Sequence, residues 1–183
     1  MLNIVLFGPP GAGKGTQAEI LSKKLNLIHL STGDLLREQI AAETELGLQA
    51  KKNIDKGELV PDDIVIKMIC SKIHDNGSAQ GFIFDGFPRT VAQAEAFDGL
   101  LNQKCVPVSG MLALEVEKQE LVNRLLTRGK SSGRSDDQDV SIIENRINVY
   151  NQKTAPLIDY YQKQGKYNPI PGMGSIDEIA ARI

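Results

Sequence analysis

Several features that would mark particular classes of protein are missing from this sequence. It has no tryptophan, two histidines and 5% aromatic residues. No apolar run approaches the roughly 20 residues that a membrane helix needs, so we expect no membrane span. The two cysteines, Cys70 and Cys105, lie far apart without metal-ligand spacing, which favours a reducing, cytoplasmic location and argues against a structural zinc. We expect no targeting segment, because an apolar strand at residues 2–7 leads directly into a glycine-rich loop.

The charge of the chain is also low. Twenty-one Lys and Arg residues stand against 23 Asp and Glu residues, giving a formal net charge of -2. A nucleic-acid-binding protein usually has a broad basic face, so no nucleic-acid partner is expected. The 183 residues are 41% hydrophobic, enough for one domain with a sizeable core. We therefore predict a single domain over residues 1–183.

Short apolar runs alternate with helical patterns along the chain, which is typical of parallel βαβ units. Strands are predicted at Leu2–Phe7, Leu27–Leu30, Phe82–Phe84, Val108–Leu114 and Tyr167–Ile170. Helices are predicted at Lys14–Leu25, Thr32–Ala42, Leu46–Asp55, Asp62–Asn76, Val91–Leu101, Lys118–Arg128 and Val140–Gln164. A capping box, Ser175-x-x-Glu178, indicates a final helix. The stretch Gly129–Gln138, rich in Gly, Ser and Asp, is predicted to be a mobile surface loop.

The segment Leu2–Thr16, LNIVLFGPPGAGKGT, gives the clearest chemical indication. Its glycines let backbone N–H groups approach an anion, its lysine adds a compact positive charge, and the next helix contributes its free N–H groups. This pattern predicts a phosphate-binding loop for a nucleoside triphosphate. The residues assigned to the loop are Gly8, Gly11, Ala12, Gly13, Lys14, Gly15 and Thr16.

The usual phosphate loop has Ser or Thr directly after the lysine as a magnesium ligand. Because a glycine follows the lysine in this sequence, direct metal ligation by the loop is not expected.

The arginines give a second indication of a phosphate-binding site. Arg37 ends the segment TGDLLR after the second predicted strand, and Arg89 ends DGFPR after the third. In an open parallel sheet, ligands bind beyond the carboxyl ends of the strands, so both should face one crevice. Arg182 is interpreted as incidental. The remaining arginines stand around the predicted surface loop: Arg124, Arg128, Arg134 and Arg146.

With GPPGAGKGT, TGDLLR, DGFPR and the arginine-bearing loop in this order, the sequence resembles the adenylate kinases, a family of nucleoside monophosphate kinases. The resemblance runs from Leu2 to the last helix and includes the Gly-Thr pair after the lysine. It implies an α/β fold of the P-loop type, with three αβα layers around a five-stranded parallel sheet. A helical segment at about residues 31–60 would bind the monophosphate, and a short lid at about 129–138 would close.

The resemblance also implies an ATP site. Beside the phosphate loop, Arg124 would stack on the adenine, and the backbone at Gly174 would lie near the same base. Asp85 would hold Mg²⁺ through its water shell, so no direct metal ligand is expected. The catalytic residues implied are Lys14, Arg89, Arg128, Arg134 and Arg146.

An AMP site follows in the same way. The residues implied are Thr32, Arg37, Val60, Gly86, Arg89 and Gln93. Two of them have a purely structural alternative. Thr90-x-x-Gln93 fits a capping box, so Gln93 could serve only the start of a helix. Thr32, with Asp34, could likewise be a helix-start residue. His29 is assigned no role.

The function expected is reversible phosphoryl transfer from Mg·ATP to AMP, giving two ADP for adenine nucleotide homeostasis, by a cytoplasmic monomer that holds both small-molecule sites. A UMP/CMP kinase of the same fold is the nearest rival, and Thr32 argues against it, because that subfamily typically has alanine there. A non-catalytic switch would need a guanine-reading Asn-Lys-x-Asp segment, and Asn151-Gln152-Lys153 lacks the aspartate. A purely structural ATP-binding module would not need two sets of arginines.

Overall fold

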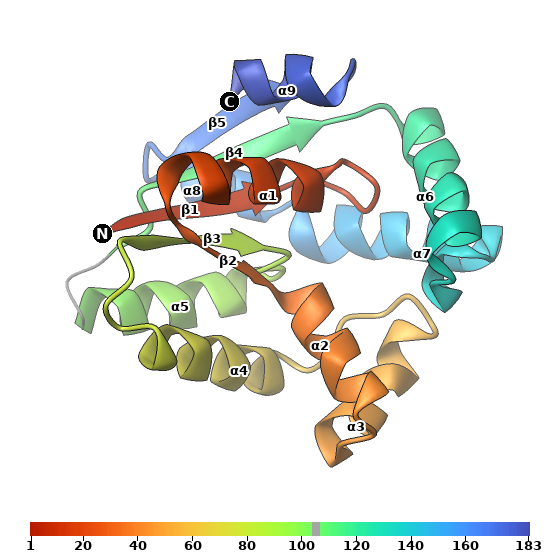
Figure 1. The fold of residues 1–183 in the computed structure, drawn as a ribbon, viewed down its shortest axis with the longest axis horizontal. Helices are drawn as coiled ribbons and strands as arrows, with labels where there is room; N and C mark the ends of the chain where they lie inside the picture. The colour runs from red at the N-terminus through yellow and green to blue at the C-terminus, as the bar shows by residue number, and fades with distance from the viewer. Residues whose placement is uncertain (104–106) are drawn as a thin grey trace.

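A computed structural model describes residues 1–103 and 107–183 of the chain; Cys105 lies outside the described residues. Its centre is a five-stranded parallel sheet in the order β2-β3-β1-β4-β5 (Figure 1). The strands are β1 (Leu2–Phe7), β2 (Ile28–Ser31), β3 (Gly81–Asp85), β4 (Gly110–Glu115) and β5 (Tyr167–Pro171). The α/β fold with a five-stranded parallel sheet is confirmed.

Helices cover both faces of this sheet, which completes the three layers expected. They are α1 (Lys14–Leu25), α2 (Thr32–Ala41), α3 (Glu45–Ile54), α4 (Asp62–Asp75), α5 (Val91–Gln103), α6 (Lys118–Ser132), α7 (Val140–Val149), α8 (Leu157–Gln162) and α9 (Ile176–Arg182). The capping box predicted for the last helix is present, between Ser175 and Glu178. None of the helices in the described part of the chain is long and apolar enough to cross a membrane.

The side chains of the central strand β1 explain why helices cover both faces of the sheet. Val5 and Phe7 point into a core shared with α4, α5 and α8. Leu6, between them in the sequence, packs on the other face against Ala18 and Leu21 of α1. Side chains alternate across a strand, so a central strand of a parallel sheet must be apolar at successive positions. This requirement produces the uninterrupted apolar run at the start of the chain.

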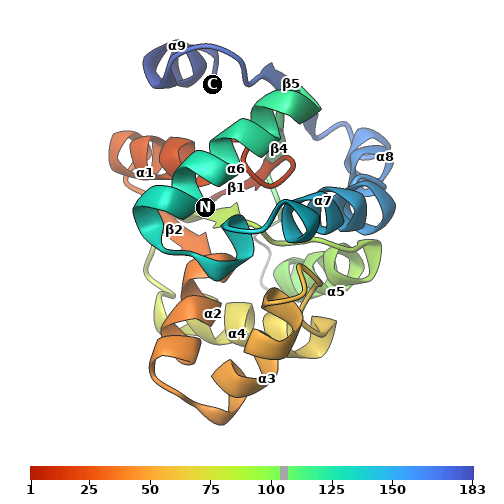
Figure 2. The same cartoon turned by 90° about the vertical axis from the view of Figure 1, so that its right-hand side faces the viewer.

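The strand order brings the sequence motifs to one edge. In the register of the sheet, Asp85 at the end of β3 lies opposite Leu6 of β1 and Ser31 of β2. The phosphate loop, TGDLLR and DGFPR therefore leave the sheet side by side. Figure 2 faces this edge, with α6 and α7 above and the α2–α3 pair below.

The α2–α3 pair projects from the body of the protein (Figures 1 and 2). The Ser31 hydroxyl accepts a hydrogen bond from Asp34 N at the start of α2, and the Thr44 hydroxyl accepts one from Gly47 N at the start of α3. These caps satisfy N–H groups that a helix leaves unpaired at its N-terminus. The two helices fill most of residues 31–60, the segment for which we predict monophosphate binding.

One predicted helix is wrong. Val140–Gln164 is not continuous, because α7 ends at Val149 and a π-helical turn follows at Tyr150–Thr154. The next helix, α8, begins only after Pro156. Proline lacks the N–H that would continue the hydrogen-bonding ladder, and its ring crowds the preceding turn. At the start of the π-helical turn, Tyr150 packs on Phe7, with ring centroids 5.6 Å apart.

The predicted loop Gly129–Gln138 is also wrong in its first part. Helix α6 continues through Ser132, and Gly133, at φ 67°, ends it. Gly129 is buried inside the helix, where a β-carbon would overlap the backbone oxygen of Asp137. The glycine thus permits close packing of the 3₁₀ turn Ser135–Asp137 on the helix, and it is no source of loop flexibility.

We predict that Gly47→Ala lowers the free energy of unfolding, by about 1–3 kcal/mol, because its methyl group would overlap the Gln39 carbonyl and force α2 from α3. Gly99→Ala is the matched control. Gly99 lies within α5 with open space around it, so alanine should stabilise the helix by about 0.5–1 kcal/mol. Denaturant unfolding of both variants measures this. Equal effects of the same sign would contradict the α2–α3 packing.

Candidate active site

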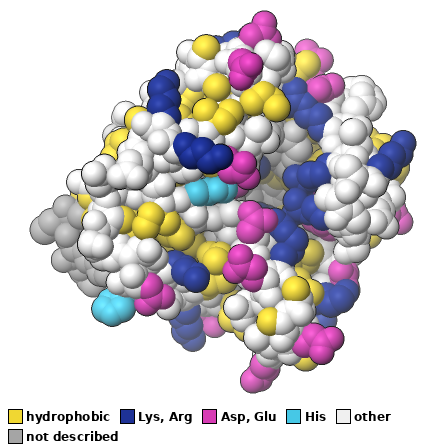
Figure 3. All heavy atoms as spheres, in the orientation of Figure 1, with side chains coloured by type: hydrophobic (Ala, Val, Ile, Leu, Met, Phe, Trp, Pro, Cys, Tyr) yellow, Lys and Arg dark blue, Asp and Glu magenta, His cyan; other side chains and the backbone are white. Residues whose placement is uncertain are grey.

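A cavity of about 470 Å³ opens at the carboxyl edge of the sheet. Figure 3 shows it as a hollow bordered by Lys and Arg side chains. The residues predicted from the sequence that line it are Gly8, Gly11, Gly13, Lys14, Gly15, Thr16, Thr32, Arg37, Val60, Asp85, Gly86, Arg89, Gln93, Arg124, Arg128, Arg134 and Arg146. Ala12 and Gly174 are not among the described residues that line it. Ala12 instead packs in the core with Leu121 and Leu125 of α6.

The phosphate loop has the backbone that its glycines imply. Gly8 and Gly13 have φ of 144° and 91°, values that side-chain-bearing residues rarely adopt. A β-carbon on Gly8 would also lie 2.8 Å from the Leu114 carbonyl oxygen of β4. Gly13 directly precedes α1 and has no side chain to cap it. The first N–H groups of α1 therefore face the cavity as donors for an anion.

Lys14 is the cation of this loop. Its Nζ donates to the carbonyl oxygens of Gly8 and Pro9, at 2.8 and 3.0 Å. Burial lowers the pKa of Lys14 from 10.5 to about 8; nearby Asp85 opposes this shift, and the positive charges of Arg89, Arg146 and Arg128 add to it. The negative charge of a bound polyanion would offset the repulsion among these cations and raise the pKa of Lys14 again.

Arg89 lines the same cavity as Lys14. Its Nε donates to the carbonyl oxygen of Gly86 at 2.7 Å, and the Thr32 hydroxyl donates to the same oxygen at 2.9 Å. Burial, followed by repulsion from Arg146, lowers the pKa of Arg89 to about 10. Ser31, not Thr32, caps α2. Thr32 therefore fixes the loop that carries Arg89.

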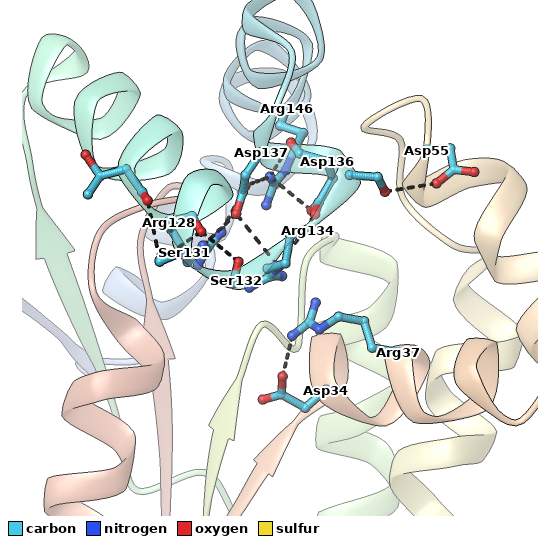
Figure 4. A network of polar contacts seen from close by, with 12 residues as sticks. Asp34, Arg37, Asp55, Arg128, Ser131, Ser132, Arg134, Asp136, Asp137 and Arg146 are labelled. Atoms are coloured by element: carbon cyan, nitrogen blue, oxygen red, sulfur yellow. Dashed lines mark hydrogen bonds and ion pairs between the residues drawn. The ribbon is translucent and has the colours of Figure 1, made fainter.

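Two carboxylates organise three further arginines (Figure 4). Asp137, whose side chain is 0% exposed, accepts from Arg128 Nε at 2.6 Å and also from Arg146. Asp136 pairs with Arg146 at 3.0 Å and with Arg134 at 3.5 Å. Burial opposes ionisation of Asp137, yet hydrogen bonds and charges from Arg128 and Arg146 hold its pKa below the usual value. The three guanidinium groups are thereby fixed around one side of the cavity.

The 3₁₀ turn that carries these carboxylates touches the α2–α3 pair. Ser135 Oγ donates to Asp55 Oδ1 at 3.3 Å. From the neighbouring helix α7, Asn145 Nδ2 donates to the Lys56 carbonyl oxygen at 2.7 Å. Below this contact, Arg37 pairs with Asp34 and lies across from Arg134. The two segments therefore meet over the cavity in this structure.

Gln93 combines the two interpretations that the sequence left open. Its backbone N donates to the Thr90 hydroxyl at 3.1 Å, as at a helix start. Its amide oxygen accepts from Arg89 N at 2.7 Å, and its amide nitrogen donates to Asp62 Oδ1 at 2.6 Å. The side chain also lines the cavity. Gln93 thus serves the start of α5 and is placed to contact a ligand.

Arg182, interpreted as incidental, has a structural task. Its Nη1 donates to the carbonyl oxygens of Pro171 and Met173, at 2.8 and 2.5 Å. Arg124 Nη2 donates to the Gly172 carbonyl oxygen at 3.2 Å. Two arginines therefore hold the loop after β5 that includes Gly174. The sequence gives no indication of this role, since the contacts are with backbone atoms and depend on how α9 folds back.

The residues present fit Mg²⁺ carried on nucleotide phosphates. Asp85, 8% exposed, lines the cavity beside the phosphate loop. In the part of the chain that is described, no three His, Cys, Asp or Glu side chains are grouped to hold a metal ion. Mg²⁺ is often bound by one or two carboxylates with substrate phosphates and water, a demand that Asp85 fits. His29 Nε2 lies 3.5 Å from Asp85 Oδ2, a contact that the sequence did not predict.

We predict that ATP binding just above pH 8 draws a proton from solution. With its pKa lowered to about 8, roughly half of the Lys14 side chains are deprotonated there, and phosphate charge restores the charged form. Calorimetry of ATP binding in buffers of different ionisation enthalpy measures this uptake, which Lys14→Met should abolish. Buffer-independent heats for the unmodified protein would contradict it.

Comparison with known proteins shows the family of this chain. A family model described as adenylate kinase matches residues 6–166. The adenylate kinase of Flavobacterium psychrophilum is 56% identical over 183 residues, which is 100% of this chain and 96% of the relative. That of Parabacteroides distasonis is 53% identical over the same shares, and that of Stenotrophomonas maltophilia (strain K279a) is 48% identical over 182 residues, with 97% of the relative covered. By sequence, fold and site together, this chain belongs to the adenylate kinase family.

Proposed function

We propose that this protein transfers the γ-phosphoryl group of ATP reversibly to AMP, giving two ADP, and so balances the adenine nucleotides. The observation that carries the proposal is the convergence of two groups of cations on one cavity. Lys14 and the arginines held by Asp136 and Asp137 line it together with Arg37 and Arg89. Two anionic substrates with adjoining phosphates match this arrangement.

The donor side is built for a triphosphate. Lys14 and the first N–H groups of α1 would bind the outer phosphates, and Arg128, Arg134 and Arg146 would surround them. Arg124, which lines the cavity and contacts the loop after β5, would stack on the adenine. Gly174 belongs to that loop, and its backbone would face the edge of the same base.

The acceptor side is built for a monophosphate. Arg37 and Arg89 would bind the α-phosphate of AMP, since their planar guanidinium groups suit phosphate oxygens. Gln93 and the backbone of Val60 would lie at the base. Thr32 supports the site through the Gly86 carbonyl oxygen that it shares with Arg89.

In this arrangement catalysis comes from positioning and charge. Phosphoryl transfer needs in-line alignment and stabilisation of spreading negative charge, and no covalent nucleophile. The AMP phosphate oxygen is anionic near neutral pH, so no strong base is required. Mg²⁺, when bound, neutralises phosphate charge, and Asp85 would hold it through water. The predicted lid at residues 129–138 reaches the end of α3 through the Ser135–Asp55 contact, and its closure would exclude water from the transferring group.

The setting of the enzyme is part of the proposal. Both nucleotide sites would be assembled from one chain, which supports a monomer. The substrates are small molecules, and the low net charge of -2 does not favour a nucleic-acid partner. We propose that the protein acts in the cytoplasm, where ATP and AMP are available.

The experiment that tests the function mixes the protein with Mg·ATP and each of AMP, CMP, UMP and GMP, and follows diphosphate formation. We expect fast ADP formation with AMP. A preference for CMP or UMP would keep the phosphate chemistry and overturn the acceptor. Binding of ATP without transfer to any acceptor would overturn the catalytic function.

We predict that Arg89→Ala lowers kcat by about 10²–10⁵ while the fold is retained, because it removes a cation from the transferring phosphate. Coupled measurement of ADP formation gives the rate, and thermal unfolding checks the fold. Lys67→Ala is the control, since Lys67 is an exposed side chain of α4 that pairs only loosely with Asp63, at 3.8 Å. Near-normal turnover in a folded Arg89→Ala protein would remove Arg89 from the mechanism.

A further inference from the structure

We propose that Asp62 is a positioning residue that fixes the orientation of the Gln93 amide, so that the acceptor site selects a 6-aminopurine over a 6-oxopurine. The inference rests on the proposed function, which places the acceptor base at Gln93. Asp62 is the first residue of α4, and it is not among the described residues that line the cavity. It therefore acts through Gln93.

The Asp62 carboxylate joins the starts of two helices. Its Oδ1 accepts from Gln93 Nε2 at 2.6 Å, and its Oδ2 accepts from the Thr90 hydroxyl at 2.9 Å. On the other side, Gln93 Oε1 accepts from Arg89 N at 2.7 Å. The amide is thus held at both ends by groups of opposite character.

These partners permit one orientation of the amide. The oxygen and nitrogen of a glutamine amide have nearly the same shape, so a glutamine side chain can often turn over. Turning Gln93 over would place its NH₂ group against Arg89 N–H and its oxygen against the Asp62 carboxylate. Two donors would then face each other, and so would two acceptors. With Gln93 only 1% exposed, water cannot replace the lost hydrogen bonds.

The fixed amide leaves one hydrogen-bond donor and one hydrogen-bond acceptor for a ligand. One N–H of Nε2 and one lone pair of Oε1 are not used by Asp62 and Arg89. A 6-aminopurine offers an N6–H donor beside the N1 acceptor, which matches this pair. A 6-oxopurine offers an acceptor at O6 and a donor at N1, the reverse pattern. A site built around hydrogen bonds rejects a ligand that leaves its buried polar groups unpaired.

Asp63 separates this role from simple helix stabilisation. Both aspartates lie in the first turn of α4, where a negative charge interacts favourably with the helix dipole. Asp63 is exposed and pairs with Lys67, whereas Asp62 holds Thr90 and Gln93. If Asp62 only stabilised the helix, the two alanine variants would behave alike.

The test compares AMP with inosine monophosphate, which differs from it only at the 6 position and the N1 proton. We would measure kcat and KM for both acceptors with Mg·ATP in the unmodified protein, Asp62→Ala, Asp62→Asn and Asp63→Ala. In Asp62→Ala we expect the AMP-to-IMP ratio of kcat/KM to fall about tenfold, mainly through a higher KM for AMP. Asp62→Asn, which preserves the shape, should lower the ratio as well, and Asp63→Ala should leave it unchanged.

A double variant distinguishes an effect of Asp62 through Gln93 from an effect that does not involve Gln93. In Gln93→Ala, the added Asp62→Ala change should not alter the AMP-to-IMP ratio further, because the amide it orients is gone. Unchanged ratios in folded Asp62→Ala and Asp62→Asn proteins would overturn the proposal, and so would an equal loss in Asp63→Ala. Absence of ADP formation from AMP in the unmodified protein would overturn the proposed function itself.

Discussion

Crowding of positive charge in one cavity is the constraint on which the rest of this site depends. Lys14 and Arg89 are brought together by the carboxyl ends of β1 and β3, and both have pKa values lowered mainly by burial. Charged groups removed from water without partners are costly. The protein tolerates the arrangement because carboxylates and backbone carbonyls from other elements surround the cations. The same arrangement would favour an anionic ligand, as the proposed function requires.

In this site, carboxylates orient the side chains that would contact the substrate. Asp137 lies beneath Arg128 and Arg146 without facing the cavity, and Asp62 stands behind Gln93 in the same way. The groups that would touch substrate are long side chains with many rotamers, which cost entropy to order. Fixing them in advance from a buried carboxylate lowers that cost on binding. The described site is therefore mostly pre-organised by acidic residues.

Local patterns explain what the sequence could predict. The phosphate loop depends on glycine dihedrals within Leu2–Thr16, and the strands depend on short apolar runs, so both could be read from neighbouring residues. Contacts between distant segments could not. Composition suggested a loop at Gly129, yet its packing against Asp137 makes it helical, and Arg182 acts on backbone atoms that only the folded chain brings near. The domain boundaries and the roles of the site residues remain predictions, because they concern bound nucleotides and motion.

The contact between the 3₁₀ turn and the end of α3 has a thermodynamic consequence. Ser135 meets Asp55, and Asn145 meets Lys56, so the two segments that flank the cavity share an interface only when both are in place. A ligand that orders one segment lowers the free energy needed to order the other. By linkage such an effect is reciprocal, so under the proposed function each nucleotide would raise the affinity for the other by the same factor.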